Sequence, residues 1–203
     1  MSDFFQGFGA DAGGMRGLAR EFGFRFTEEL DRQYKHDNPT GMPEMPLFRN
    51  GTDKPISELV YGTFAGIDVQ VFDYRTYSYP DDPANDHRTC LLFTFPGDFP
   101  VLTVGPHTRL SRINERTSSA FLQRYRIMSR DPEATKLIID DTMQRWLMTT
   151  DDSLRLEWTG GGLLGHVPLV HPDIVPVLLQ QVYGVFLRIP DAAWSRYGLG
   201  YTP

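Results

Sequence analysis

The spacing of apolar residues along the chain predicts strands in its middle third and again near residue 154. Apolar and polar positions alternate there, or apolar residues run together over short stretches, as is typical of half-buried and fully buried strands. The predicted strands are Glu58–Phe64, Ile67–Tyr79, Arg88–Phe95, Phe121–Met128 and Leu154–Trp158.

Two stretches instead have the three- to four-residue spacing of an amphipathic helix. The first runs from Asp131 to about Met148, where an acidic N-cap and a proline at the first helical position mark the start. The second begins at His171-Pro172-Asp173, and its apolar face includes Leu178 and Val182. Shorter helices are predicted over Met15–Phe22 and Thr27–Tyr34, the first ending at Gly23.

These elements predict an α+β fold: a mostly antiparallel sheet with two long amphipathic helices packed against it. Short loops between consecutive strands favour antiparallel pairing, and helices gathered on one face complete the layers. We expect residues 1–14 to form a flexible tail and residues 15–203 a single domain. The proline-rich stretch Asn38–Pro55 reads as a loop, anchored to the core by Leu47 and Phe48.

Two local irregularities stand out inside the strands. The apolar face of Ile67–Tyr79 shifts by one position near Phe72, which predicts a bulge or bend. After Phe95, the stretch Pro96–Pro100 is expected to turn the chain into the apolar residues 101–104.

The glycines at positions 160, 162 and 165 match the G-x-G-x-x-G spacing of dinucleotide-binding loops. That motif must open a helix, whereas Val167-Pro168 continues as extended chain, and no acidic residue follows at the ribose-binding distance. A glycine-rich turn between antiparallel strands accounts for the same residues. We therefore predict a hairpin turn here and no cofactor.

Composition narrows the class of protein. The chain has 203 residues, is 40% hydrophobic, and carries a formal charge of −6. The negative charge argues against nucleic-acid binding, although Arg124, Arg126 and Arg130 could meet a local anion. A single cysteine, the lack of a secretory leader and an apolar stretch too short to span a bilayer predict a cytoplasmic protein that does not cross the membrane.

Side chains capable of chemistry are few and scattered. His166 and His171 lie five positions apart across a proline, so they do not form a two-histidine metal face. Cys90 begins a buried-looking strand and is expected to be inert packing. The loop containing Asp81, Asp82, Asp86 and His87 is acidic but does not have the spacing of a calcium loop, so no metal site is predicted. Asp140-Asp141 are expected at mid-helix, facing solvent.

Five segments of the chain form a recognisable series. They are an aromatic strand (Phe121–Ile127), a D-x-x-A helix start (Asp131 to Ala134), a helix end (Asp141–Met148), the segment Gly62–Tyr79, and a closing I-P-x-x-x-W-x-x-Y-G (Ile189 to Gly198). Together they resemble an uncharacterised bacterial family of actinobacterial type that has no assigned activity. The resemblance covers roughly residues 16 to 198 and implies shared architecture without transferring any catalytic residue.

Two functions remain open on the sequence alone. The first is a non-catalytic binding or adaptor domain for a protein partner or an apolar small molecule, with homodimerisation also possible. Its candidate ligand-binding residues are the aromatics Phe72, Tyr74, Tyr77 and Tyr79, which equally suit a core. The alternative is a hydrolase or metal-dependent enzyme that combines the Asp81–His87 loop with His166 or His171. No catalytic residue is assigned.

Overall fold

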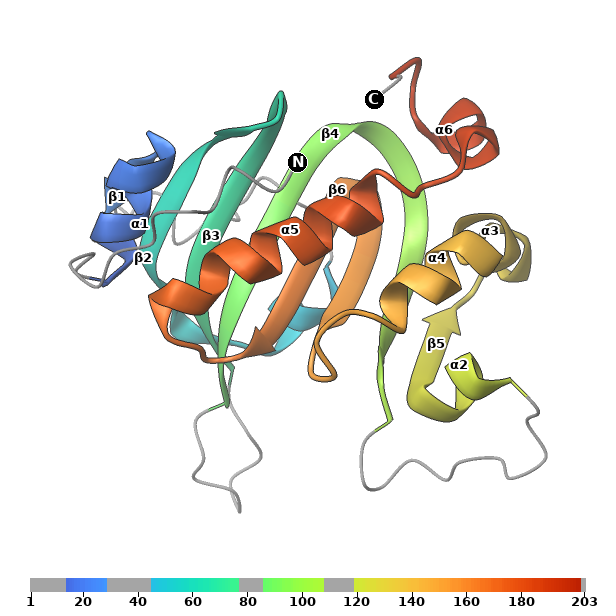
Figure 1. The fold of residues 1–203 in the computed structure, drawn as a ribbon, viewed down its shortest axis with the longest axis horizontal. Helices are drawn as coiled ribbons and strands as arrows, with labels where there is room; N and C mark the ends of the chain where they lie inside the picture. Colours follow the sequence, from blue (N-terminus) through green and yellow to red (C-terminus); the bar gives the residue numbers. More distant parts are fainter. Residues whose placement is uncertain (1–13, 29–44, 77–85, 108–118, 202–203) are drawn as a thin grey trace.

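A six-stranded antiparallel sheet forms the centre of the computed structural model, with most helices gathered on one of its faces (Figure 1). The structure describes residues 14–28, 45–76, 86–107 and 119–201. This architecture confirms the predicted α+β class. The strands are β1 (Arg25–Thr27), β2 (Gly51–Phe64), β3 (Ile67–Thr76), β4 (Asp86–Pro106), β5 (Tyr125–Ser129) and β6 (Arg155–Pro168).

Neighbouring strands pair in the order β1-β2-β3-β4-β5, and β6 pairs with the other edge of β4. The helical elements are α1 (Gly14–Phe22), η3 (Pro46–Asn50), α2 (Ala120–Arg124), α3 (Pro132–Ile138), α4 (Asp141–Leu147), η4 (Pro172–Ile174), α5 (Val175–Phe186) and α6 (Asp191–Tyr197). The long strand β4 arches across the molecule, and β6 follows it beside α5 (Figure 1).

The glycine run does not form the predicted hairpin turn. It lies inside β6, which continues along β4 to Pro168, so these glycines do not open a helix. Between the pairs Thr94–Gly162 and Phe99–Gly160, four residues of β4 face a single residue of β6. The expected turn at Pro96–Pro100 is likewise a bend within one continuous strand. Both strands bend together because each remains paired with the other on either side of the irregularity.

Two glycines are required at this bend for different reasons. Gly160 has a φ of 52°, in the left-handed region that disfavours residues with a Cβ. A Cβ on Gly161 would lie 2.1 Å from the carbonyl oxygen of Phe95, closer than any real contact. The run is therefore explained by backbone geometry.

Apolar residues cover both faces of the sheet, which explains the shifted pattern near Phe72. Successive side chains of a strand point to opposite faces, so Val71 lies in the larger core and Phe72 in a second, smaller core. The strand β3 pairs regularly with β4 at this point. The predicted irregularity lies instead in the partner strand β2, where Glu58 has a φ of 52°.

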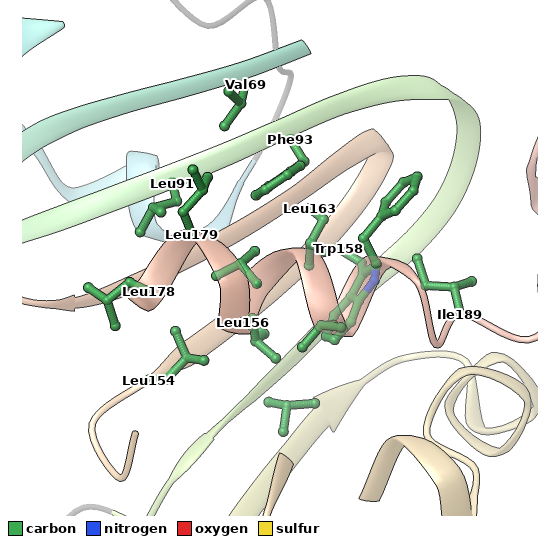
Figure 2. Packing of buried hydrophobic residues seen from close by; sticks show 14 of the residues in the cluster. Val69, Leu91, Phe93, Leu154, Leu156, Trp158, Leu163, Leu178, Leu179 and Ile189 are labelled. Carbon is green, nitrogen blue, oxygen red and sulfur yellow. The ribbon is translucent and has the colours of Figure 1, made fainter. Parts of the chain in front are cut away.

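On the helix-covered face, α5 packs against β4 and β6. Leu178 and Leu179 of the helix belong to the same core as Leu91, Phe93 and Leu163 of the strands (Figure 2). The helix can approach closely at Gly165, where a Cβ would be 2.3 Å from a methyl carbon of Val182. The predicted start of this helix is confirmed, with the 3₁₀ turn η4 leading into α5.

Two of the predicted elements have wrong bounds. Phe121–Arg124, expected to be strand, belongs to the short helix α2, and strand begins only at Tyr125. The helix expected from Asp131 to Met148 is two helices, because Asp140 caps a second start by accepting a hydrogen bond from the Met143 amide at 2.8 Å. Asp140 and Asp141 thus lie at a helix start and not at mid-helix.

The N-terminal third contains further differences. The helix α1 and its end at Gly23 are confirmed, but Arg25–Thr27 is strand where a helix was expected to begin. Residues 29–34 of that predicted helix lie outside the described part of the chain. Within the expected loop Asn38–Pro55, the last five residues already belong to β2. Leu47 and Phe48 do anchor this stretch to the core, as predicted.

Candidate functional site

The face of the sheet opposite α5, which we call the second face, brings together several of the residues singled out from the sequence. Its core consists of side chains from β2, β3, β4 and β6 together with Met45. These are Met45, Leu59, Phe72, Tyr74, Cys90, Leu92 and Leu164. The candidate aromatics Phe72 and Tyr74 are thus neighbours, with ring centroids 6.5 Å apart. The other two, Tyr77 and Tyr79, lie outside the described residues.

A short stretch of chain, residues 45–50, covers the second face; we call it the cover segment. Met45 is completely buried, and Leu47 and Phe48 are partly buried against the same core. The Phe48 ring packs against both candidate aromatics, with centroid distances of 6.2 Å to Phe72 and 5.1 Å to Tyr74. These contacts place both aromatics in a packed interior, where Phe72 has no exposed surface.

Beside this core lies a buried polar pair, His166 and Glu157, both on β6. The two are on opposite sides of the bend, yet His166 Nε2 is 3.6 Å from Glu157 Oε1. Only 3% of His166 and 4% of Glu157 are exposed. The second carboxylate oxygen, Oε2, accepts a hydrogen bond from the Leu47 amide at 3.1 Å. Glu157 therefore connects the sheet to the cover segment across 110 positions of sequence.

The surroundings of His166 decide which ring nitrogen carries the proton. A guanidinium nitrogen of Arg88 is 3.5 Å from Nδ1. Because a guanidinium can only donate, Nδ1 must be the acceptor, and in the neutral ring the proton is on Nε2, facing Glu157. Burial lowers the pKa of His166, and this outweighs the nearby Glu157 carboxylate, which raises it. The imidazole is thus neutral near neutral pH.

Two other titratable groups of the second face, Cys90 and Tyr74, are also held in their uncharged forms. Burial raises the pKa of the Cys90 thiol well above its usual value, so it is a poor nucleophile at neutral pH. Burial likewise raises the pKa of Tyr74 to about 12. The Tyr74 hydroxyl donates to the Phe48 carbonyl at 3.4 Å. Cys90 and His166 are cross-strand partners in the β4–β6 ladder, and both are buried.

Other sequence candidates do not join this cluster. His171 is exposed and forms an ion pair with Asp173 at 3.1 Å. His87 lies at the start of β4, where its carbonyl accepts from the Leu169 amide at 2.9 Å. Asp81 and Asp82 fall outside the described residues. Within the described ranges, no three His, Cys, Asp or Glu side chains are grouped so as to hold a metal ion.

The arginine-rich stretch does not act as one patch. Arg124 donates to the carbonyl oxygens of Met148 and Thr150 at 2.9 and 3.0 Å and pairs with Asp152. It therefore fastens the chain that follows α4. Arg126 and Arg130 are exposed.

Glu157 was missed by the sequence reasoning. Alternation along Leu154–Trp158 assigns it to the polar side of the strand, which suggests solvent. No local signal marked it, because the apolar neighbours Leu156 and Trp158 are what alternation places beside any polar residue of a half-buried strand. Its role became visible only when the cover segment was placed over it.

Comparison with known proteins adds a likeness of fold. No protein-family model matches the chain, and no curated protein sequence does so. A solved structure with a similar fold is that of the mycobacterial trehalose monomycolate transport factor A, TtfA, with a TM-score of 0.61 and 15% sequence identity. The match covers 87% of this chain and 94% of that one. At this identity the likeness shows the fold alone, and its mycobacterial source agrees with the actinobacterial type of the resemblance.

Among the residues that the structure describes, none of the helices combines the length and hydropathy needed to cross a lipid bilayer.

Proposed function

We propose that this chain is a non-catalytic binding domain of the adaptor type, which recognises a protein partner or an apolar ligand through the second face of its sheet. The observation that carries the proposal is that the potentially reactive side chains of that face are buried, and that one of them binds the cover segment. Cys90 and His166 are buried and uncharged, and Glu157 accepts a hydrogen bond from the cover segment. Buried groups that hold a segment of chain in place suit a binding function better than a catalytic one.

The likeness to a transport factor supports this proposal. The shared architecture extends over nearly the whole of both chains. A role in transport requires binding and release of cargo or partners, and it needs no reactive constellation. We therefore expect this domain to work within a transport assembly, with the aromatic core around Phe72 and Tyr74 as the surface that becomes available for binding.

Thermal unfolding with added ligands tests the proposal, because a ligand that binds only the native state raises the midpoint. Trehalose monomycolate and a simple fatty acid are the apolar probes, and trehalose alone is the polar control. We expect stabilisation by at least one apolar probe and none by trehalose. The response should be larger in a Phe48→Ala variant, whose weakened cover segment competes less, and unchanged in Leu187→Ala, an exposed position on the other side.

The enzyme alternative makes the opposite prediction. Ester hydrolysis by the purified chain that disappears in a His166→Gln variant would overturn the proposal. Stabilisation by divalent metal ions alone would do so as well, since it would point to the predicted Asp81–His87 loop.

A further inference from the structure

The cover segment contacts the sheet in the way that a bound peptide contacts a groove. Its apolar side chains enter a surface built from four strands, where Met45 is fully buried and Phe48 packs against two aromatic rings. The segment forms a 3₁₀ turn, and within it the Phe48 amide donates to the Met45 carbonyl at 3.0 Å. Two side chains of the sheet in turn recognise its main chain.

The main-chain contacts give the groove a specific chemistry. Glu157 accepts from the Leu47 amide, and the Tyr74 hydroxyl donates to the Phe48 carbonyl. Burying a carboxylate costs free energy unless it is hydrogen-bonded, and a bond to a charged acceptor is stronger than a neutral one. His166 Nε2 lies 3.6 Å from the other oxygen of the same carboxylate. A buried acceptor aimed at one amide selects for a segment with a free N–H at that position.

We propose that the second face is a peptide-binding groove which the chain's own residues 45–48 occupy, and that the protein partner presents a segment of the same kind. This inference rests on the proposed binding function and names its ligand class. The partner segment has an unbranched apolar residue, then proline or another residue suited to a turn, then leucine and an aromatic residue. The leucine-type position has a free amide for Glu157.

A partner segment must compete with the cover segment, which is joined to the same domain. A segment joined to its own domain acts at an effective concentration of about millimolar, so a free peptide of similar affinity gains little access. Weakening the internal segment without altering the groove should expose the site. Proline at position 46 limits the backbone freedom lost on docking, which favours binding of a short segment.

The experiment measures binding of a fluorescein-labelled peptide with the sequence of residues 44–50 by fluorescence anisotropy. The protein is the full chain carrying Leu47→Ser and Phe48→Ser, which removes the internal anchors and keeps the groove. We expect saturable binding at least about tenfold tighter than to the unaltered chain. Adding Glu157→Ala should weaken it, whereas Leu187→Ala should not. A peptide with serine at both anchor positions should not bind.

A single Phe48→Ala variant serves if the double variant fails to unfold cooperatively in urea. No saturable binding to a folded variant would overturn the peptide inference. If that variant still binds trehalose monomycolate or fatty acid, the binding function stands and only the ligand class is wrong. Ester hydrolysis that depends on His166 would overturn both.

Discussion

Replacing Gly161 by alanine tests whether β4 and β6 bend together as one paired ribbon. The added Cβ would lie 2.1 Å from the Phe95 carbonyl oxygen and 3.5 Å from the Gly97 amide nitrogen. Both neighbours are backbone atoms of a strand that is paired on either side, so neither can move without breaking the ladder. Overpacking a rigid site typically costs about 1–3 kcal/mol, and a contact this short predicts a loss near the upper end.

Gly160 provides the matched control. Its φ of 52° disfavours alanine, but a Cβ there would meet nothing within 4 Å. We therefore expect Gly160→Ala to lower the free energy of unfolding by about 1 kcal/mol. Alanine is disfavoured in the left-handed backbone conformation, and part of this penalty is offset because alanine also restricts the unfolded chain. Gly160→Asn should cost less still, since asparagine tolerates this conformation.

Urea unfolding followed by tryptophan fluorescence measures the differences in free energy of unfolding, and Trp158 lies buried two positions from the bend. The expected order of loss is Gly161→Ala, then Gly160→Ala, then Gly160→Asn. A Gly161→Ala variant as stable as the unaltered chain, or as stable as Gly160→Ala, would refute the bent-ribbon geometry.

Three further predictions concern other parts of the molecule. Because burial lowers the pKa of His166 in the folded state, the unfolded chain binds the proton first, so the free energy of unfolding should fall as pH drops below about 6.5. A His166→Gln variant should lack this part of the pH dependence in urea titrations from about pH 8 to 5, and an identical pH dependence would contradict the assignment. A Cβ on Gly184 would lie 2.2 Å from the Trp146 ring, so Gly184→Ala should lower the free energy of unfolding in urea by about 2 kcal/mol. The loss should be far smaller when Trp146 is replaced by leucine, and equal losses in the two backgrounds would refute the contact. Asp131 accepts from the amides of Glu133 and Ala134 at 3.0 and 2.9 Å; Asp131→Ala should cost about 1 kcal/mol and Asp131→Asn less, and equal effects in thermal melts would argue against capping.

Local signals in the sequence were enough to predict the α+β class, the helix starts at Asp131 and His171, and the anchoring of Leu47 and Phe48. Each of these features is encoded by residues close together in the sequence, such as a helix cap or the spacing of apolar positions. The glycine run was different, because a hairpin turn and a bend in a continuous strand favour the same residues. What decides between them is the partner strand β4, whose own bend lies more than fifty positions earlier.

The candidate site shows the same limit. Phe72 and Tyr74 could be chosen from composition, and the structure places them side by side. Glu157 could not, because its strand pattern is that of a surface residue. Its hydrogen-bond donor, the Leu47 amide, lies 110 positions away. A polar residue that is paired with a distant segment cannot be recognised from the alternation of apolar and polar residues in its own strand.

Amide hydrogen exchange at Leu47 tests most directly whether Glu157 holds the cover segment on the second face. A hydrogen bond to a charged group contributes about 1.5–3 kcal/mol, so Glu157→Ala should speed exchange of this amide by about ten- to a hundredfold. Glu157→Gln, which keeps an acceptor, should have a smaller effect. Thr103→Ala, a substitution at the cross-strand neighbour of Glu157, should leave the rate unchanged. A Leu47 amide that exchanges at the unprotected rate in the unaltered chain would contradict the proposed role of the second face.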